Sequence, residues 1–430
     1  GRSRMTTMII TIVLFMIMLL MGFPVAYAMG IAGMWGLLDF GTVSDVMAAQ
    51  KCFSTMNSFT LMAVPFYILA GELMNTGGIT RKLIRFCSLL LQHWRGALAH
   101  ANVLVSMIMA GFAGSATADA VSVGAIMIPA MEEDNYTPEF SAGVTAASSC
   151  IGPIIPPSLT MVIYGGITGL SIGTLFMAGI VPGILIGFAQ MGVCAYYGRK
   201  ENWAKKKRAK LREILSAAWD AKWALMVPVI VLGGIYGGIM TPTEAAAIAA
   251  FYGLIVGLFL YKEMDFKCLI NSCIESCETS AVIIVLMAMA TLFGNIMTIE
   301  DVPGTVARAI LSFSENKIVI LMLINVLLLI VGTFMEALAA IVILVPILLP
   351  IVTGVGVSPL HFGVIIVVNL AIGFITPPVG VNLFVASGVA KAKLENIASQ
   401  ALPMIALMLI VLLICTYIPE VPLILVGGPH

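Results

Sequence analysis

The chain has 430 residues, of which 60% are hydrophobic and only 10% are charged, and its formal net charge is zero. Soluble domains carry about 25% charged residues, so this composition excludes an ordinary soluble protein and predicts an all-α polytopic membrane protein. The stretches 140–198 and 337–390 contain no Asp, Glu, Lys or Arg. We therefore expect lipid and neighbouring helices around most of the chain, and no nucleic-acid partner.

Ten apolar segments are predicted to cross the membrane, because a membrane-spanning helix needs about 20 apolar residues. They are 6–20, 22–38, 58–77, 138–168, 170–198, 223–240, 243–261, 279–299, 359–390 and 396–418. Segment 199–222 carries nine Lys and Arg residues against three acids. Cytoplasmic loops are rich in Lys and Arg, so this segment is predicted to be a basic cytoplasmic linker.

Two further segments, 96–133 and 317–352, are predicted to be re-entrant helical hairpins. Each has two apolar arms that are too short to cross comfortably, separated by a small and polar centre that begins at Gly111 or Gly332. Non-helical backbone is tolerated at membrane depth only inside protein or beside a water-filled cavity. We therefore expect the two hairpin tips to meet near the bilayer midplane.

The two halves of the chain repeat their helix-breaking residues at an offset of 221 positions. The pairs are Gly111 with Gly332, Pro129 with Pro350, Pro138 with Pro359, Pro156 with Pro377, and Pro157 with Pro378. The pattern predicts a first repeat over 1–198 with a broken helix at 138–168, and a second over 223–430 with a broken helix at 359–390. Each repeat would hold five spans and one hairpin, an odd number, so the repeats are expected to be inverted. Paired broken segments of this kind are the sequence signature of a transport site.

The first hairpin tip and the first Pro-Pro break are predicted to bind a cation and an anion. Gly permits tight backbone, and Pro leaves upstream carbonyl groups without a donor. Free carbonyls and hydroxyls suit Na⁺, so we assign Ser115, Ser149, Gly152 and Pro156 to a Na⁺ site. Helix N-termini favour anions, so Ser115, Thr117 and Pro156 are predicted to contact a carboxylate substrate. The alternative is that these Gly and Pro residues only pack and kink helices.

The second tip and the second break repeat this chemistry. The set predicted to bind Na⁺ there comprises Gly332, Thr333, Gly373, Thr376 and Pro377. The metal is expected to be transported Na⁺, held at two or more sites and without an organic cofactor. Backbone carbonyl oxygens can bind Na⁺ without a charged side chain, because the negative end of each carbonyl dipole lies on its oxygen.

Asp119 and Glu336 are the isolated carboxylates of the two hairpins. An ionisable group at membrane depth is a functional hypothesis by default, so both are predicted to contact substrate. Each could instead cap the second arm of its hairpin by accepting hydrogen bonds from the first helical amides. The two roles are compatible, and both stay open.

Four motifs in the same order resemble the large membrane subunit of tripartite ATP-independent periplasmic (TRAP) transporters, of the DctM-like or SiaM-like kind. They are Gly114-Ser-Ala-Thr-Ala-Asp-Ala120, Gly152-Pro-Ile-Ile-Pro-Pro-Ser158, Thr241-Pro-Thr-Glu-Ala-Ala-Ala247 and Thr376-Pro-Pro-Val-Gly380. The resemblance covers essentially the whole chain. It implies an elevator-type ion transporter, in which hairpins and broken helices move past a fixed scaffold.

The resemblance also implies Na⁺-driven uptake of an organic acid, such as sialic acid or a C4-dicarboxylate, across the bacterial inner membrane. A periplasmic substrate-binding protein would deliver the acid, and a small four-helix membrane subunit (DctQ/SiaQ-like) would accompany this chain. Because only four residues precede Met5, we expect that subunit to be a separate chain.

Matched motif by motif, the resemblance places Ser115 in the substrate and first Na⁺ region, where Gly152 and Pro156 supply backbone groups. It places Gly332 and Thr376 in the second Na⁺ site. Glu336 stands where many relatives carry Asp, so the resemblance assigns it no detailed role.

Other functional classes fit the residues less well. An enzyme would need a nucleophile with its base or a metal cluster, and the sequence contains no His-Glu-x-x-His motif. An ATP-driven pump would need a Gly-x-x-x-x-Gly-Lys-[Ser/Thr] loop, which is also absent from the sequence. Paired broken repeats favour alternating access over a channel. A Na⁺-coupled carboxylate transporter without a binding protein, and a non-transporting scaffold subunit, stay open as alternatives.

Overall fold

The computed structural model describes residues 4–40, 45–203, 205–299, 301, 304–305, 308 and 316–427. Within these ranges all regular structure is helical and no β-strand occurs. Seven helices are long and apolar enough to cross a membrane by length and composition. The all-α membrane class is therefore confirmed, whereas the count of about ten spans and their inverted arrangement stay predictions.

The helices are distributed over both halves of the chain. The first half contains α1 (Arg4–Leu20), α2 (Val25–Phe40), α3 (Asp45–Met56), α4 (Ala63–Thr76), α5 (Ile79–Leu91), α6 (Ala97–Ala113), α7 (Ala116–Glu133), α8 (Pro138–Ser149), α9 (Leu159–Thr168) and α10 (Ile172–Lys200). The second half contains α11 (Leu211–Tyr236), α12 (Pro242–Ile255), the π-helical turn η1 (Val256–Leu260), α13 (Phe266–Ile299), α15 (Lys317–Phe334), α16 (Ala337–Gly354), α17 (Pro359–Gly373), α18 (Val381–Ala390), α19 (Leu394–Tyr417), α20 (Glu420–Leu423) and the 3₁₀ turn η2 (Ile424–Val426).

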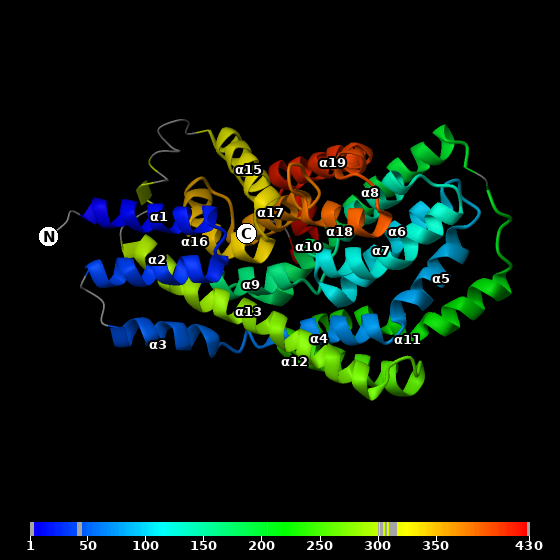
Figure 1. The fold of residues 1–430 in the computed structure, drawn as a ribbon, viewed down its shortest axis with the longest axis horizontal. Coiled ribbons are helices and arrows are strands. Elements are labelled where there is room, and N and C mark those ends of the chain that lie inside the picture. The colour runs from blue at the N-terminus through cyan, green and yellow to red at the C-terminus, as the bar shows by residue number, and fades with distance from the viewer. Residues whose placement is uncertain are drawn as a thin grey trace.

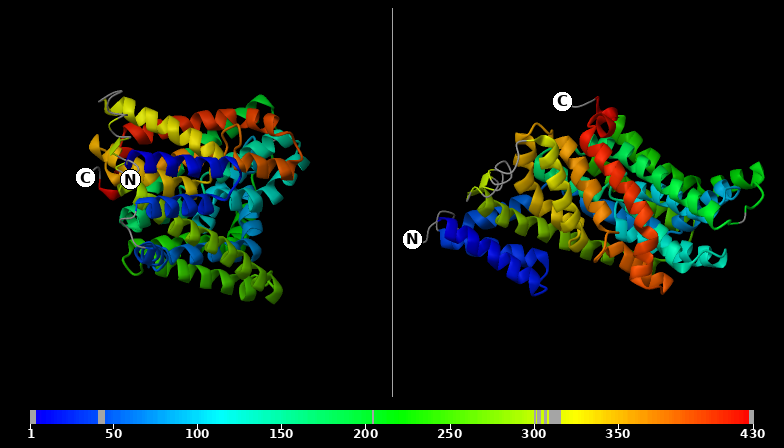
Figure 2. Two further views of the ribbon diagram at one scale, coloured as in Figure 1. Left: turned by 60° about the vertical axis from the view of Figure 1, so that its left-hand side comes forward. Right: turned by 90° about the horizontal axis from the view of Figure 1, so that it is seen from above.

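One group of helices is organised around α13, which packs against α2, α3 and α4, while α4 also packs against α12. In Figure 1, α1, α2 and α3 lie at one end of the molecule and α13 runs from them toward α12. Figure 2 shows from above that the blue N-terminal helices and the green segment near residue 200 lie at opposite ends. This group borders the helices that carry the predicted site residues, through contacts of α13 with α16 and of α4 with α9.

The second group contains the two predicted hairpins and the two broken segments. The arms of the first hairpin are α6 and α7, and those of the second are α15 and α16. The first Pro-Pro pair lies between α8 and α9, and the second between α17 and α18. The contacts between the halves are reciprocal, because α9 packs on α16 of the other half and α18 packs on α7.

Two helices differ from the segments expected from the sequence. Helix α13 continues without interruption through the segment before 279–299, because residues 266–299 contain no Pro and a single Gly. Helix α11 begins at Leu211, inside the basic segment 199–222, because the Glu213 carboxylate accepts a 3.0 Å hydrogen bond from the Lys210 amide and so caps the helix.

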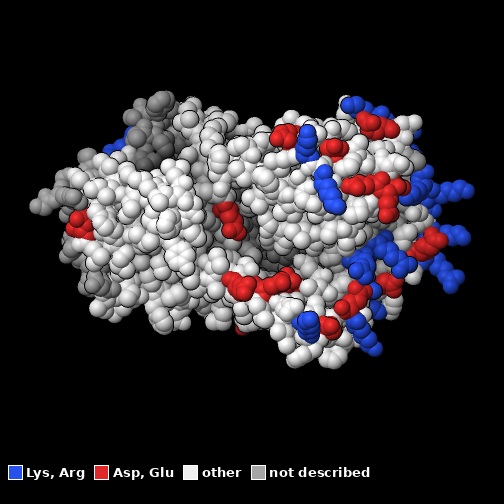
Figure 3. Space-filling model, viewed as in Figure 1, with Lys and Arg blue, Asp and Glu red and all other residues white. Residues whose placement is uncertain are grey.

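Charged side chains gather toward one end of the molecule. Figure 3 shows Lys, Arg, Asp and Glu concentrated there on the visible face, while most of the remaining surface is uncharged. Large exposed apolar side chains occur on the helices of the opposite end, for example Leu20 and Phe53. Such a surface is stable in lipid, because exposing apolar side chains to the hydrocarbon core of the bilayer costs no free energy.

Candidate functional site

The first hairpin turns sharply between α6 and α7. Gly114 has a φ of 57°, in the left-handed region that favours glycine, and a Cβ atom there would lie 2.7 Å from the Pro157 carbonyl oxygen. Ser115 is extended and begins α7. The glycine therefore lets the tip turn and approach the Pro-Pro break at the same time.

Ser115 does not cap the helix that it begins. Six other helices begin at a Ser, Thr or Asn whose side chain accepts a hydrogen bond from its own first turn. They are α8 at Thr137, α9 at Ser158, α10 at Ser171, α12 at Thr241, α15 at Asn316 and α17 at Ser358. The Ser115 side chain instead approaches the Thr117 hydroxyl at 3.2 Å. The first amides of α7 therefore stay free of a side-chain cap and can bind an anion.

The first Pro-Pro break is held open by its own hydroxyl groups. The Ser158 hydroxyl donates to the Pro153 carbonyl, and the Thr160 hydroxyl donates to the same carbonyl at 3.1 Å. Ser158 also accepts a 3.2 Å hydrogen bond from the Met161 amide and so caps α9. These bonds satisfy polar groups that the break would otherwise leave unpaired inside apolar surroundings.

The tips of the two hairpins meet at one small cavity of about 40 Å³. Its lining residues are Gly114, Ser115, Ala116, Thr117, Pro153, Leu159, Thr160, Glu336, Ala337, Leu338 and Phe374. Of the residues predicted to bind substrate, Ser115, Thr117 and Glu336 lie here. The cavity therefore lies between the beginning of α7 and the beginning of α16.

Three of the four residues predicted to form the first Na⁺ site lie together, namely Ser115, Ser149 and Gly152. A Cβ atom at Gly152 would lie 3.2 Å from the carbonyl oxygens of both Ser115 and Ser149. Two carbonyl oxygens from different segments thus approach one glycine. Each already accepts a backbone hydrogen bond, from the Asp119 amide at 3.2 Å and from the Gly152 amide at 3.0 Å, so only its second lone pair is left for Na⁺. Pro156 precedes a cis peptide bond deeper in the break and does not line the cavity.

Two of the residues predicted to form the second Na⁺ site, Gly332 and Gly373, face each other at close range. A Cβ atom at Gly373 would lie 2.7 Å from the Gly332 carbonyl oxygen, so α15 and α17 meet through bare backbone. The Thr333 hydroxyl donates to Ile330 and the Thr376 hydroxyl to Ile372 within their own segments, at 2.7 and 2.8 Å. Donation leaves the lone pairs of both hydroxyl oxygens free for a cation.

Pro377 lies apart from the small cavity. With Pro378, Leu383, Leu394 and Glu395 it lines a second pocket of about 410 Å³, between α18 and α19. The Pro377-Pro378 peptide bond is cis, as is the bond between Pro156 and Pro157.

Asp119 lies inside the protein rather than at the cavity. It is fully buried in the first turn of α7, beside the Ser106 hydroxyl and Cys150. Among the described residues, neither carboxylate oxygen has a hydrogen-bond partner. A contact between Asp119 and substrate stays a prediction, and the side chain does not line the space between the tips.

Buried polar side chains, most of which the sequence analysis did not single out, join the helices of each half. Ser106 donates to Ser148, and Asn102 donates to Thr145, at 3.1 and 2.7 Å between α6 and α8. In the second half, Asn369 donates to Asn325 and Asn325 donates to Thr416, at 2.6 and 3.1 Å. Ser148 and Asn369 are separated by the repeat offset of 221 positions, which was the one signal that could have identified the second network.

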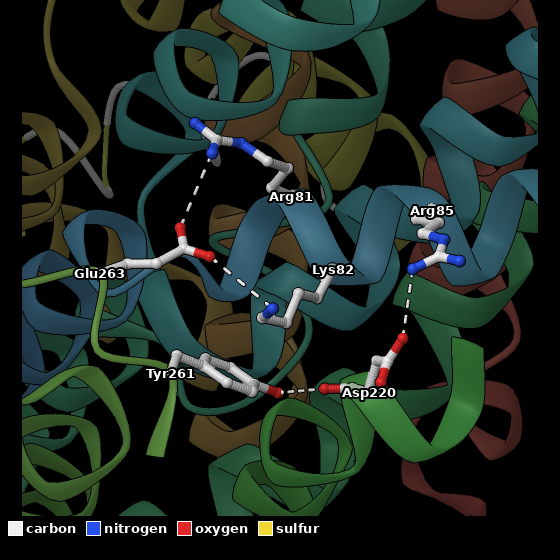
Figure 4. Close-up of polar contacts among 6 residues, drawn as sticks. All are labelled: Arg81, Lys82, Arg85, Asp220, Tyr261 and Glu263. Carbon is white, nitrogen blue, oxygen red and sulfur yellow. Dashed lines mark hydrogen bonds and ion pairs between the residues drawn. The ribbon is translucent and has the colours of Figure 1, made fainter. Parts of the chain in front are cut away.

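Ionic contacts at the charged end hold α5 against its neighbours. Figure 4 shows Arg81 and Lys82 on α5 directed toward Glu263, each with a 3.7 Å ion pair, and Arg85 paired with Asp220 of α11 at 3.2 Å. Tyr261 donates a 2.7 Å hydrogen bond to the Asp220 carbonyl. Because α5 leads directly into the first hairpin, these contacts fix the hairpin base to the α11–α13 region.

Comparisons with known proteins identify the family of sequences to which this chain is similar. The family described as "Tripartite ATP-independent periplasmic transporter, DctM component" matches residues 12–421. The isethionate TRAP transporter permease protein DctMQ of Oleidesulfovibrio alaskensis is 53% identical over 96% of this chain, which spans only 65% of that relative's length. The C4-dicarboxylate TRAP transporter large permease protein DctM of Pseudomonas aeruginosa is 41% identical over 93% of both chains. The sialic acid TRAP transporter large permease protein SiaM of Vibrio cholerae is 38% identical over 95% of this chain and 96% of that protein.

A solved structure shares the fold. The YdaH transporter of Alcanivorax borkumensis superposes with a TM-score of 0.65 over 89% of each chain, at 15% sequence identity. At this identity the likeness concerns the arrangement of helices and not the chemistry of the site.

Proposed function

Because the chain belongs to the DctM component family of tripartite ATP-independent periplasmic transporters, we propose that it is the membrane transport subunit of a Na⁺-coupled secondary transporter for an organic acid. It is a multi-pass protein of the bacterial inner membrane. The observation that carries the proposal is the small cavity between the two hairpin tips, which the first turns of α7 and α16 both line.

The cavity is suited to an anion by its backbone rather than by basic side chains. Its lining contains no Lys or Arg, and Ser115 leaves the α7 amides uncapped. Helix N-termini carry partial positive charge. The Ser115 and Thr117 hydroxyls add hydrogen-bond donors, because each O–H group can rotate toward the ligand. An acid group placed against the beginning of α7 would therefore be held without a permanent cation.

Two Na⁺ ions would neutralise the bound acid. The first would lie where the Ser115 and Ser149 carbonyls face Gly152, and the second where Gly332 faces Gly373, with Thr376 near it. Each position joins a hairpin tip to a broken segment, so a bound cation would hold the tip against the break. Binding of Na⁺ would thus complete the substrate site, which is the physical basis of coupling.

Movement of the acid across the membrane would follow from displacement of the hairpin helices past the α13 group. The reciprocal contacts of α9 with α16 and of α18 with α7 support treating the two halves as related units of one moving body. The ion pairs that join α5 to Glu263 and Asp220 would have to rearrange during this displacement. This is the elevator mechanism, with inverted repeats, that we propose for the chain.

A periplasmic substrate-binding protein and a small membrane subunit complete the proposed transporter. Relatives are described as permeases for isethionate, C4-dicarboxylate and sialic acid. All three are organic acids, and we propose that this chain takes an acid from this range, with the isethionate class favoured by the 53% identity.

Thermal unfolding of the purified chain tests the proposed site. We expect NaCl, but not an equal concentration of choline chloride, to raise the unfolding temperature, and isethionate to raise it further only when Na⁺ is present. Equal stabilisation by isethionate in both salts would contradict coupling between the two ligands.

A further inference from the structure

One acidic side chain lies at a cavity that we propose for an anion. Glu336 begins α16 and lines the space that Ser115 and Thr117 line from the other side. It accepts no capping hydrogen bond from its own helix. In the described ranges it also has no ion pair.

The cavity therefore has two chemically different ends. The α7 end offers donors, namely free amides and the Ser115 and Thr117 hydroxyls. The α16 end offers an acceptor, the Glu336 carboxylate, which ordinarily carries a negative charge. A purely anionic ligand would be attracted to the first end and repelled by the second.

We propose that Glu336 is a specificity-determining residue that selects a short organic anion bearing a hydroxyl group. The sulfonate or carboxylate would lie against the beginning of α7, and the hydroxyl would donate a hydrogen bond to the Glu336 carboxylate. This inference rests on the proposed function, since it names the substrate class of the same cavity.

The size of the cavity favours a short ligand over a long one. About 40 Å³ between Ser115 and Glu336 has room for a few water molecules. Even a two-carbon hydroxy acid is larger than this space and requires the tips to separate, and a nine-carbon sugar acid requires a much larger separation. The apolar Leu159 and Phe374 side of the lining would cover the short carbon linker.

If a ligand hydroxyl donates to a charged acceptor, the protein should discriminate clearly between ligands with and without that hydroxyl. Removing a hydrogen bond to a charged group typically lowers affinity by about tenfold to a hundredfold. Without the hydroxyl, the ligand would also leave the carboxylate of Glu336, which is an exposed residue, near an anion with only water between them. Ethanesulfonate should therefore bind much more weakly than 2-hydroxyethanesulfonate, although both carry the same charge.

Calorimetric titration of the purified full chain in saturating Na⁺ tests the proposal with these two sulfonates. The native protein should prefer 2-hydroxyethanesulfonate by about tenfold or more. Glu336→Ala should bring the two affinities together, mainly by weakening the hydroxylated ligand, and Glu336→Asp should restore the preference. Retention of the full preference in Glu336→Ala would overturn the proposal.

Two further measurements distinguish recognition of the hydroxyl from a distant effect and from cation binding. Glu395→Ala alters a carboxylate in the separate pocket, and an equal loss of preference there would overturn a local role for Glu336. If Glu336→Ala weakens both sulfonates equally and lowers the apparent Na⁺ affinity, Glu336 is a cation ligand and the proposal fails. Native protein that binds both sulfonates equally would overturn this inference alone. Native protein that binds no organic acid in Na⁺ would overturn the proposed function as well.

Discussion

The Nδ2 amide of Asn382 on α18 donates a 2.8 Å hydrogen bond to the Ser149 hydroxyl on α8, although 233 positions separate the two residues. Both side chains are fully buried. Asn382 follows the second Pro-Pro break and Ser149 precedes the first. One hydrogen bond therefore connects the broken segments of the two halves beside the first proposed Na⁺ position.

Asn382→Ala should destabilise the protein and weaken Na⁺ binding together. Loss of this buried hydrogen bond is expected to cost about 1 kcal/mol, because the Ser149 hydroxyl still donates to the Ala146 carbonyl. Thermal unfolding at several Na⁺ concentrations measures both effects. The matched change Asn396→Ala removes an exposed amide from α19 and should alter neither. A Na⁺ dependence that is unchanged in Asn382→Ala would contradict the coupling of this bond to the cation.

Gly373→Ala should be more damaging than any other single methyl addition in the second half. The new Cβ would lie 2.6 Å from the Gly332 Cα, and neither backbone can retreat without moving a helix. We expect a loss of about 3 kcal/mol in stability, or failure to fold. Gly388→Ala is the control, because no atom lies within 4 Å of its added Cβ and alanine favours the helix. Equal unfolding temperatures for the two variants would exclude close packing as the reason for Gly373.

Ser115→Ala and Thr376→Val should reduce Na⁺-dependent uptake by about tenfold each while leaving expression intact, because each removes one oxygen ligand or donor. Uptake of labelled acid by cells that express the complete transporter measures this. Thr353→Val provides the control, since its hydroxyl also donates to a carbonyl of its own helix but is exposed at the end of α16. Normal uptake by both site variants would contradict the assignment of these residues.

Cysteine labelling should place the basic segment in the cytoplasm. In a background with Cys277→Ser, which removes the exposed native thiol, Lys205→Cys should react with a membrane-impermeant maleimide only after the cells are opened. Because the repeats are expected to be inverted, the base of the second hairpin should lie outside, so Thr353→Cys at the end of α16 should react in intact cells. Reversed accessibility would overturn the predicted orientation.

Much of the fold follows from composition and from Gly and Pro placement. Gly114, Gly332 and the two Pro-Pro pairs lie between helices or where helices meet closely, because these residues permit tight backbone and interrupt hydrogen-bonded helices. The continuous α13 was not predicted. Its polar first part and its apolar second part differ in composition and so suggested two elements, although no helix breaker separates them.

The candidate site was predictable only in part. Ser115, Thr117 and Glu336 stood out as polar residues in apolar segments, and they line one cavity. Asn382 and Thr160 did not stand out, because one amide or hydroxyl in a helix gives no pattern and its partner lies in a distant segment. The buried position of Asp119 likewise depends on how α7 is rotated against α6 and α8, which a sequence does not specify at single-residue precision.

Uptake into proteoliposomes tests Na⁺-coupled transport most directly. Vesicles would contain this chain with its small membrane subunit and a binding protein loaded with labelled organic acid. We predict accumulation of the acid against its gradient when Na⁺ is higher outside, and loss of accumulation when Na⁺ is equal on both sides or in the Ser115→Ala variant. Equal accumulation with and without the Na⁺ gradient would contradict the central claim.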